Sequence, residues 1–381
     1  MQLRGLKMYY QIQGIKVIPR IFCMWLLAVF FAEVNAADWS MLNGGPQHLS
    51  RSPDIISLDP AGVWQEGIAR RFYASPVVIG DRIYVAARGK RIKSLNIKDG
   101  AVVWETALKG MLSATPAVFG QTLVAGAKDG VVTAMSLVDG KIIWQVKTGG
   151  KVLSSPVIKD GTVFIGSNDL HLYALDLHTG KVRWRYRAND YKYGGLYASP
   201  SLGDKQVFIG GKNGLLHAVD IKTGKPGWVV ALGSAIYGAA AVSGERLYIG
   251  SYDRNLYALQ AEDGGEVWRV ELDDWPQGAP VVFKDKVVIA SRSGILYGVD
   301  AAGGSILWRM DLEEGLRHSP VIGANGVGVI GTTGGRLLGI DLQKQELIWE
   351  REMEGGVFGP VAVTEHGIVA ATLDGIVTLL H

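Results

Sequence analysis

Short apolar runs separated by turn-forming residues extend along most of the chain. From residue 155 the sequence reads SPVIKDGTVFIGSNDLHLYALDLHTGKVRW, in which β-branched and aromatic runs alternate with Gly, Asp and Asn. Such runs favour strands, and such clusters favour turns. We therefore predict strands at VFIGS (163–167), HLYALD (171–176) and KVRWR (181–185), with Gly180 in the tight turn before the last of them.

This pattern repeats with a period of about 40 residues. The segment ALDLHTGKVRW (174–184) recurs as SLNIKDGAVVW (94–104), AMSLVDGKIIW (134–144), AVDIKTGKPGW (218–228), ALQAEDGGEVW (258–268), GVDAAGGSILW (298–308) and GIDLQKQELIW (339–349). A second marker keeps the same phase: Pro76, Pro116, Pro156, Pro200, Pro280, Pro320 and Pro360, with Ala241 in the missing place. Four short strands in each such period indicate a β-propeller blade.

The two ends of the chain predict how the ring closes. After Pro360 only three strands remain, GPVAV, GIVAAT and IVTLLH, whereas the early segment AGVWQEG around Trp64 has no strands before it. An N-terminal strand would complete the last blade and remove the free edges of an open array. The predicted fold is therefore all-β, an eight-bladed β-propeller of four-stranded antiparallel blades, closed by that strand.

The pattern A-x-D-x-x-T-G-K-x-x-W resembles the repeat of the pyrroloquinoline quinone (PQQ) β-propeller family. Residues 174–184 and 218–228 match it throughout, and the other units match it in part. In that family the tryptophan packs between neighbouring blades. The resemblance assigns this structural blade-docking role to Trp64, Trp104, Trp144, Trp184, Trp228, Trp268, Trp308 and Trp349.

In size, blade number and motif density the chain is most similar to the BamB-type outer-membrane assembly factors of this family. Those proteins dock on the periplasmic domains of the β-barrel insertase and are lipoproteins. This chain lacks a lipobox, because Arg20, Ile21 and Phe22 precede Cys23. The resemblance implies a binding scaffold, and the missing lipobox leaves its place in that assembly machinery open.

The N-terminal segment is expected to be a targeting signal. Basic residues precede the apolar run 21–32, and small residues end at Ala36, so we predict a cleaved signal peptide over 1–36, a lead-in segment over 37–61 and the propeller over 62–381. The protein is then periplasmic or extracellular, not lipidated, with no transmembrane segment after cleavage. Cys23, the only cysteine, lies in the signal, which excludes disulfides and cysteine metal sites in the mature chain.

Charge argues against a nucleic-acid partner. The sequence has 39 Lys and Arg and 36 Asp and Glu, and residues 1–36 hold four of the basic and one of the acidic residues. The remainder is therefore close to neutral. Binding to nucleic-acid phosphates needs a positive surface.

Motifs for chemistry are weak. Gly326–Gly331 fits GxGxxG but opens no predicted helix, and the Thr-Gly-Lys turns at 179–181 and 223–225 lack the remaining parts of a phosphate loop. The seven histidines are scattered, which favours packing or surface positions over ligation. Recurring carboxylates in the second hairpins fit either a hard cation or ordinary turn chemistry, and we favour turns: Asp129, Asp169, Asp253 and Asp374.

One face of the predicted propeller carries the candidate binding residues. Strand parity places the connections between blades and the second hairpins on the same face, and the spacer 185–197 is longer than its equivalents and rich in tyrosine and arginine. Phe358 lies in one of these connections. The candidate partner-binding face comprises Arg71, Tyr73, Arg185, Arg187, Tyr191, Tyr193, Tyr197, Tyr237, Trp275, Arg317 and His318.

The sequence thus predicts a non-catalytic envelope scaffold that binds a protein partner, with no cofactor, metal or nucleic acid. Two alternatives remain open. The first is a small PQQ-dependent dehydrogenase, which would need the quinone and Ca²⁺; the bare repeats disfavour it because the quinoprotein dehydrogenases of the family are larger. The second is a cell-surface module that binds polysaccharide or another small ligand.

Overall fold

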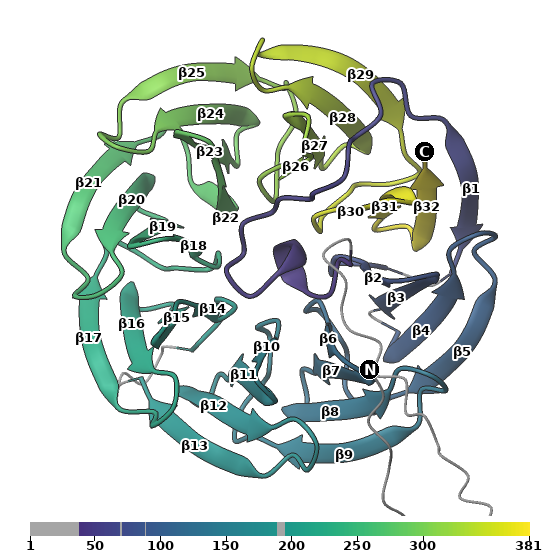
Figure 1. Cartoon of the computed structure of the whole chain (residues 1–381), viewed down its shortest axis with the longest axis vertical. Coiled ribbons are helices and arrows are strands. Elements are labelled where there is room, and N and C mark those ends of the chain that lie inside the picture. Colours follow the sequence, from purple (N-terminus) through teal and green to yellow (C-terminus); the bar gives the residue numbers. More distant parts are fainter. Residues whose placement is uncertain (1–37, 69–70, 88, 189–194) are drawn as a thin grey trace, which may run out of the picture. The chain divides into compact units, whose positions relative to one another are not determined.

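The computed structural model describes residues 38–68, 71–87, 89–188 and 195–381. These residues form eight four-stranded antiparallel sheets, which surround a common centre as propeller blades (Figure 1). The predicted eight-bladed fold is confirmed. The predicted signal peptide, residues 1–36, lies outside the described residues.

Each blade runs outward from a short inner strand. The inner strands are β2 (Val77–Ile79), β6 (Ala117–Phe119), β10 (Val157–Lys159), β14 (Ser201–Leu202), β18 (Ala241–Ser243), β22 (Pro276–Phe283), β26 (Val321–Ile322) and β30 (Ala362–Thr364). The second strands are β3 (Arg82–Ala87), β7 (Thr122–Gly126), β11 (Thr162–Gly166), β15 (Gln206–Gly210), β19 (Arg246–Gly250), β23 (Lys286–Ser291), β27 (Val327–Gly331) and β31 (Gly367–Ala371).

The two remaining strands complete each blade toward the rim. The third strands are β4 (Arg91–Asn96), β8 (Val131–Ser136), β12 (His171–Asp176), β16 (Leu215–Asp220), β20 (Asn255–Gln260), β24 (Ile295–Asp300), β28 (Arg336–Asp341) and β32 (Ile376–Leu380). The outer strands are β5 (Val102–Ala107), β9 (Ile142–Lys147), β13 (Val182–Arg187), β17 (Pro226–Ala231), β21 (Glu266–Glu271), β25 (Ile306–Asp311), β29 (Glu346–Glu352) and β1 (Gly62–Gly67). Blades are numbered 1 to 8 from β2–β5 onward.

Burial explains the two kinds of strand. In blade 3 every residue of β11 is buried, whereas residues of the outer strand β13 are alternately exposed and half-buried. A strand covered on both faces by neighbouring blades is nearly all apolar, and a rim strand is not. The core therefore lies between blades rather than in one central mass, and one hydrophobic cluster joins Trp39 and Ile56 to Leu380.

Every outer strand carries a β-bulge just before its tryptophan. In blade 3, Ala174 pairs with Trp184 and Leu175 with Val182, so Arg183 has no partner in the ladder. The same shift occurs in the other blades, β1 included. A bulge twists an edge strand and makes it a poor template for another chain, so it protects the unpaired rim.

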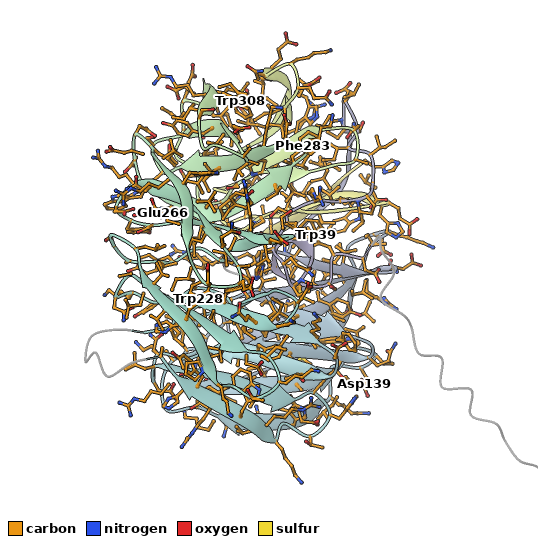
Figure 2. The ribbon with its side chains drawn as sticks, turned by 60° about the vertical axis from the view of Figure 1, so that its left-hand side comes forward. Trp39, Asp139, Trp228, Glu266, Phe283 and Trp308 are labelled. Atoms are coloured by element: carbon orange, nitrogen blue, oxygen red, sulfur yellow. The ribbon has the colours of Figure 1, made fainter. Side chains whose placement is uncertain are left out.

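The tryptophans join each blade to the next. Trp144 Nε1 donates a hydrogen bond of 2.8 Å to the carbonyl oxygen of Leu177 in the following blade. Equivalent bonds to a carbonyl of the next blade are formed by Trp64, Trp104, Trp184, Trp228 and Trp268. Trp349 donates instead to the Ser57 carbonyl of the lead-in segment, at 3.1 Å. Trp308 Nε1 has no partner in the described part of the chain. By contrast, Asp139, in the turn between β8 and β9 of blade 2, is exposed on the surface (Figure 2).

The proline marker also has a structural basis. The residue before the proline donates its backbone N–H to the hydroxyl of the equivalent residue one blade on: Ser75 to Thr115 (2.9 Å), Thr115 to Ser155 (3.0 Å) and Ser155 to Ser199 (2.9 Å). This hydroxyl relay links blades 1 to 4. Our assignment of Ala241 to the missing proline is wrong by one residue: Ala241 starts β18 as Ser201 starts β14, so Ala240 is the equivalent of Pro200.

The lead-in segment crosses the centre of the ring, where the purple chain runs in Figure 1. It contains the short 3₁₀ turn η1 (Leu42–Gly44). Its backbone forms hydrogen bonds with five inner strands, at Val78, Val118, Leu202, Val242 and Ile322. Trp39 begins this path, and its side chain lies in the interior (Figure 2).

The ring closes as the sequence predicted. β1 pairs antiparallel with β32 and becomes the outer strand of blade 8. Just beyond this ladder, Ala61 and His381 exchange two backbone hydrogen bonds of 2.9 Å. In the described part of the chain, no helix has the length and apolarity that crossing a membrane would require.

Candidate functional site

The connections between blades lie on the same face as the hairpins between second and third strands, which we call the connection face. In five connections a buried apolar residue donates its N–H to the preceding blade's hairpin: Phe72, Val152, Leu196, Ile236 and Val357. Leu112, Pro276 and Leu316 have the equivalent place in the other three. The backbone position of this residue also sets the position of the residue that follows it. These next residues form an entrance ring: Tyr73, Ser113, Leu153, Tyr197, Tyr237, Gln277, Arg317 and Phe358.

Four aromatic side chains on this face form a continuous stack, which we call the aromatic ladder. The rings of Tyr197 and Tyr237 are 5.7 Å apart, those of Tyr237 and Tyr252 4.6 Å, and those of Tyr252 and Trp275 4.8 Å with an interplanar angle of 15°. The Arg292 guanidinium lies 5.1 Å from the Trp275 ring centre. The ladder spans blades 4 to 6 and is held rigid by its own ring contacts.

A second aromatic group lies where blades 7, 8 and 1 meet. The Arg317 guanidinium is 5.2 Å from the Phe358 ring centre, and the rings of Phe358 and Tyr73 are 6.1 Å apart at 76°. Arg71 is exposed on the same connection as Tyr73. The structure therefore brings the predicted residues together as two groups rather than as one patch.

Three of the predicted residues lie elsewhere. Arg185 and Arg187 belong to the outer strand β13, paired with Tyr173 and His171, so they lie on the rim and not on a loop of the connection face. The placement we predicted for them is wrong, because β13 continues three residues past its tryptophan. His318 is 3% exposed and lies below the entrance ring. Tyr191 and Tyr193 fall outside the described residues.

Two residues of the ladder were missed in the sequence. Tyr252 and Arg292 come from second hairpins, SYDR (251–254) and SRSG (291–294), whose face was predicted correctly. Each donates its backbone N–H to a connection, Tyr252 to Ala235 (3.0 Å) and Arg292 to Trp275 (2.9 Å). An aromatic or arginine residue at the hairpin tip is the sequence signal that could have identified them.

Buried histidines near this face are neutral. Burial lowers the pKa of His318 to about 4, against the opposing effect of the Ser319 and Val357 carbonyls. Burial likewise lowers the pKa of His217 to about 4, and Tyr186 Oη lies 3.1 Å from its Nδ1. The contact between Tyr186 and His217 joins blades 3 and 4.

The recurring aspartates serve the turns. Asp169 accepts hydrogen bonds from the N–H of His171 (3.0 Å), the N–H of Gly149 (2.7 Å) and the Tyr173 hydroxyl (2.6 Å). Burial acts to raise the pKa of Asp169, but these donors outweigh it and hold the pKa below its usual range. Among the described residues, no three His, Cys, Asp or Glu side chains are grouped closely enough to hold a metal.

Comparison with known proteins gives one family. The family model described as "Outer membrane protein assembly factor BamB" matches residues 52–228, 212–294 and 292–381. No curated protein matches the sequence.

Solved structures share the fold at low identity. BamB from Moraxella catarrhalis is 20% identical with a TM-score of 0.74, over 85% of this chain and 100% of that one. A quinohemoprotein alcohol dehydrogenase from Comamonas testosteroni is 14% identical with a TM-score of 0.78, over 90% and 80% of the two chains. The computationally designed protein Ika8 is 17% identical with a TM-score of 0.74, over 87% and 100%. An assembly factor, a dehydrogenase and a designed protein thus share one architecture, so the fold alone does not determine the function.

Proposed function

Because the chain belongs to the outer membrane protein assembly factor BamB family, we propose that it is a non-catalytic scaffold of the cell envelope that binds a protein partner. The observation that carries this proposal is the family match, which extends from residue 52 to residue 381 and so includes all eight blades. On this proposal the protein is exported by a cleaved signal peptide and acts in the periplasm, in outer-membrane protein assembly.

The connection face is the proposed docking surface. Its aromatic ladder is enriched in the residue types that dominate binding energy at protein interfaces, namely Tyr, Trp and Arg. Tyr237 is 36% exposed, and its ring is held between Tyr197 and Tyr252. Because the side chains of the aromatic ladder are already ordered, they lose little conformational entropy on binding.

The engagement of polar groups on this face supports a binding role over catalysis. Asp169 and Asp253 each accept hydrogen bonds from turn N–H groups and from a tyrosine hydroxyl, and His318 is enclosed. A general acid or base needs an accessible group within hydrogen-bond reach of a substrate. These side chains are committed to holding hairpins and connections together.

Binding to the periplasmic domains of the β-barrel insertase from the same organism tests the proposal. We expect a saturable signal for residues 37–381 in biolayer interferometry, weakened at least about tenfold by Trp275→Ala because the ladder loses the ring that contacts both Tyr252 and Arg292. Arg292→Ala should weaken binding several-fold.

The matched control is Arg185→Ala, which removes the same side chain from the rim strand β13 instead of the ladder. We expect it to bind like the unmodified protein. No binding by the unmodified protein would contradict the proposed partner, and equal losses in Arg292→Ala and Arg185→Ala would contradict the proposed face.

Thermal-shift titration with PQQ and Ca²⁺ separates the scaffold from the dehydrogenase alternative. A ligand that binds only the folded state raises the melting temperature. We expect no saturable shift, because Asp169 and Asp253 already accept internal hydrogen bonds. A saturable shift would contradict the non-catalytic assignment and would call for alcohol and sugar oxidation assays.

A further inference from the structure

One position in the third strand of each blade determines what fills the space beneath the connection face. It is the third residue of the strand: Lys93, Thr133, Tyr173, His217, Tyr257, Tyr297, Leu338 and Thr378 in blades 1 to 8. Blades 3, 5 and 6 have tyrosine there. Blades 2 and 8 have threonine, which is too small to occupy the same volume.

In all three tyrosine blades the phenol donates to a carboxylate, which comes from the blade's own second hairpin in blades 3 and 5 and from the preceding connection in blade 6. Tyr173 donates its hydroxyl to Asp169 Oδ2 at 2.6 Å, Tyr297 donates to Asp273 Oδ1 at 2.7 Å, and Tyr257 donates to Asp253 Oδ2. Burial and the aspartate raise the pKa of Tyr173 to about 12, so the hydroxyl keeps its proton. Each of these blades thus contains a phenol subsite: a carboxylate acceptor beside a space that a ring fills.

Blade 2 keeps the acceptor and lacks the ring. Asp129 Oδ1 accepts the Val131 N–H at 3.2 Å, as Asp169 Oδ1 accepts the His171 N–H in blade 3. Within the described part of the chain Asp129 Oδ2, the counterpart of the tyrosine acceptor, receives no hydrogen bond. A cleft of about 240 Å³ opens at this place, lined by Leu108, Lys109, Gly110, Ala127, Asp129, Val131, Thr133, Gln145 and Lys147.

Blade 8 provides an internal comparison. Thr378 also lines a cleft, of about 350 Å³, but Asp374 is not part of its lining. The amide of Gln65 in this blade donates to Glu354 at 2.9 Å, whereas the equivalent Gln145 donates to Thr133 Oγ1 at 3.1 Å. Of these two threonine blades, only blade 2 combines the open space with the carboxylate.

We propose that the blade 2 cleft binds the tyrosine side chain of a protein partner. The incoming phenol donates to Asp129 and displaces the Gln145 amide from Thr133, reproducing the internal contact of Tyr173 with Asp169. Lys109 and Lys147 are exposed and line the cleft, so an acidic residue beside that tyrosine complements the site. That a protein partner provides the tyrosine rests on the proposed function, whereas the existence of a phenol-binding site does not.

The direct test uses N-acetyl-L-tyrosinamide as the probe and the threonine methyl NMR signals of residues 37–381 as the readout. We expect a saturable shift of Thr133 and none of Thr378. N-acetyl-L-phenylalaninamide, which lacks the hydroxyl, should bind at least about tenfold more weakly, because the site's acceptor then stays unpaired. No saturable shift at Thr133, or equal affinity for the two probes, would overturn the inference.

Two substitutions with opposite expected effects are tested, so that the result does not depend on the folding of a single variant. Thr133→Tyr should abolish probe binding, because the chain's own ring then fills the cleft. Tyr173→Thr should create a second site beside Asp169 and raise the stoichiometry from one probe to two. Retained binding in Thr133→Tyr, or an unchanged stoichiometry in Tyr173→Thr, would overturn the inference.

The partner assay separates this inference from the proposed function. If the probe binds at Thr133 but no partner binds the protein, the proposed function fails and the phenol site stands. If the partner binds Thr133→Tyr as tightly as the unmodified protein, the inference fails and the scaffold stands. Loss of partner binding in Thr133→Tyr, with its melting temperature unchanged, supports both.

Discussion

The glycine in the turn between third and outer strands has two roles. Gly180 has φ +70°, which side chains rarely adopt, and a Cβ placed on it would lie 2.8 Å from Trp144 of the preceding blade. The same approach occurs at Gly100, Gly140, Gly224, Gly264 and Gly304. The Gly of the repeat motif in one blade thus packs against the Trp of the same motif in the preceding blade. Blade 7 has Gln345 with positive φ in this turn, and there Trp308 lacks its carbonyl partner.

Gly180→Ala should lower the free energy of unfolding by about 2–4 kcal/mol. Strain from the left-handed backbone and the clash with Trp144 add together. Gly161→Ala is the matched control in the same blade, because its φ is +66° but its nearest neighbour is the end of Arg183 at 3.9 Å. It should lose only about 1–2 kcal/mol, the backbone share. Chemical denaturation followed by tryptophan fluorescence measures both, and equal losses would contradict the Trp–Gly contact.

Buried histidines predict how stability depends on pH. The folded-state pKa values of His217 and His318 are both about 4, below the value of about 6.5 for an unfolded histidine. The unfolded chain therefore takes up protons first as the pH falls, so stability is present above pH 6.5 and is lost between about 6.5 and 4. Each histidine should cost about 2 kcal/mol at pH 5 relative to pH 7.5.

Urea unfolding of the wild type and of His318→Gln at pH 7.5 and pH 5 checks this expectation. The glutamine variant starts less stable but should lose about 2 kcal/mol less between the two pH values. An identical pH dependence in both proteins would mean that His318 does not titrate as its burial requires.

At the scale of elements, the hydroxyl relay ties inner strands of different blades together. Thr115 Oγ1 accepts the buried Ser75 N–H, and both residues are almost fully buried. The relay stops after Ser199, because Ala239 is the next residue in register and has no hydroxyl. Blades 1 to 4 therefore have a set of inter-blade bonds that the blade 4 to blade 5 junction lacks.

Thr115→Val keeps the side-chain shape but leaves the Ser75 N–H without its acceptor. We expect a loss of about 1–3 kcal/mol in the free energy of unfolding, the usual cost of an unpaired buried donor. Thr115→Ser, which keeps the hydroxyl, should lose much less. A valine variant as stable as the serine variant would show that the relay contributes nothing.

The elements were predictable from the sequence to the extent that side chains mark them. Trp and the residues around Pro recur in every blade because blade contacts demand them, so their phase predicted all eight sheets. The path of residues 38–54 left no such mark, since the lead-in pairs with inner strands through backbone groups. Of the entrance ring, the predicted set contained Tyr73, Tyr197, Tyr237 and Arg317. Arg185 was misplaced because the long spacer was counted from Trp184 rather than from the end of β13.

At the scale of the whole molecule, β1 and the lead-in segment hold the ring closed in different ways. β1 completes the hydrogen-bonded ladder of blade 8, whereas the lead-in pairs with five inner strands at the centre. His48 anchors that central path. Its Nε2 lies 2.8 Å from the Pro200 carbonyl and its Nδ1 lies 3.0 Å from the Leu42 carbonyl.

Two truncations should therefore behave differently. A chain that begins at residue 55 keeps β1 and should fold with a lower melting temperature, because five inner strands lose backbone partners. A chain that begins at residue 68 exposes the edge of β32 and should aggregate or dimerise. Size-exclusion chromatography and thermal melts distinguish the two results. A monomeric, cooperatively melting chain from residue 68 would contradict the role of β1.

Closure by β1 also sets an order in time. Gly67 and Ile376 are partners in the ladder although 309 positions separate them. β1 is therefore synthesised long before β32, and it cannot pair until β32 has been made. Such distant pairing forms late and slowly. A chain whose synthesis or export stops before β32 leaves β1 without its partner, and its exposed edge marks it for the proteases and chaperones that act on unfinished chains. We therefore expect the ring to close only in a chain that contains both β1 and β32.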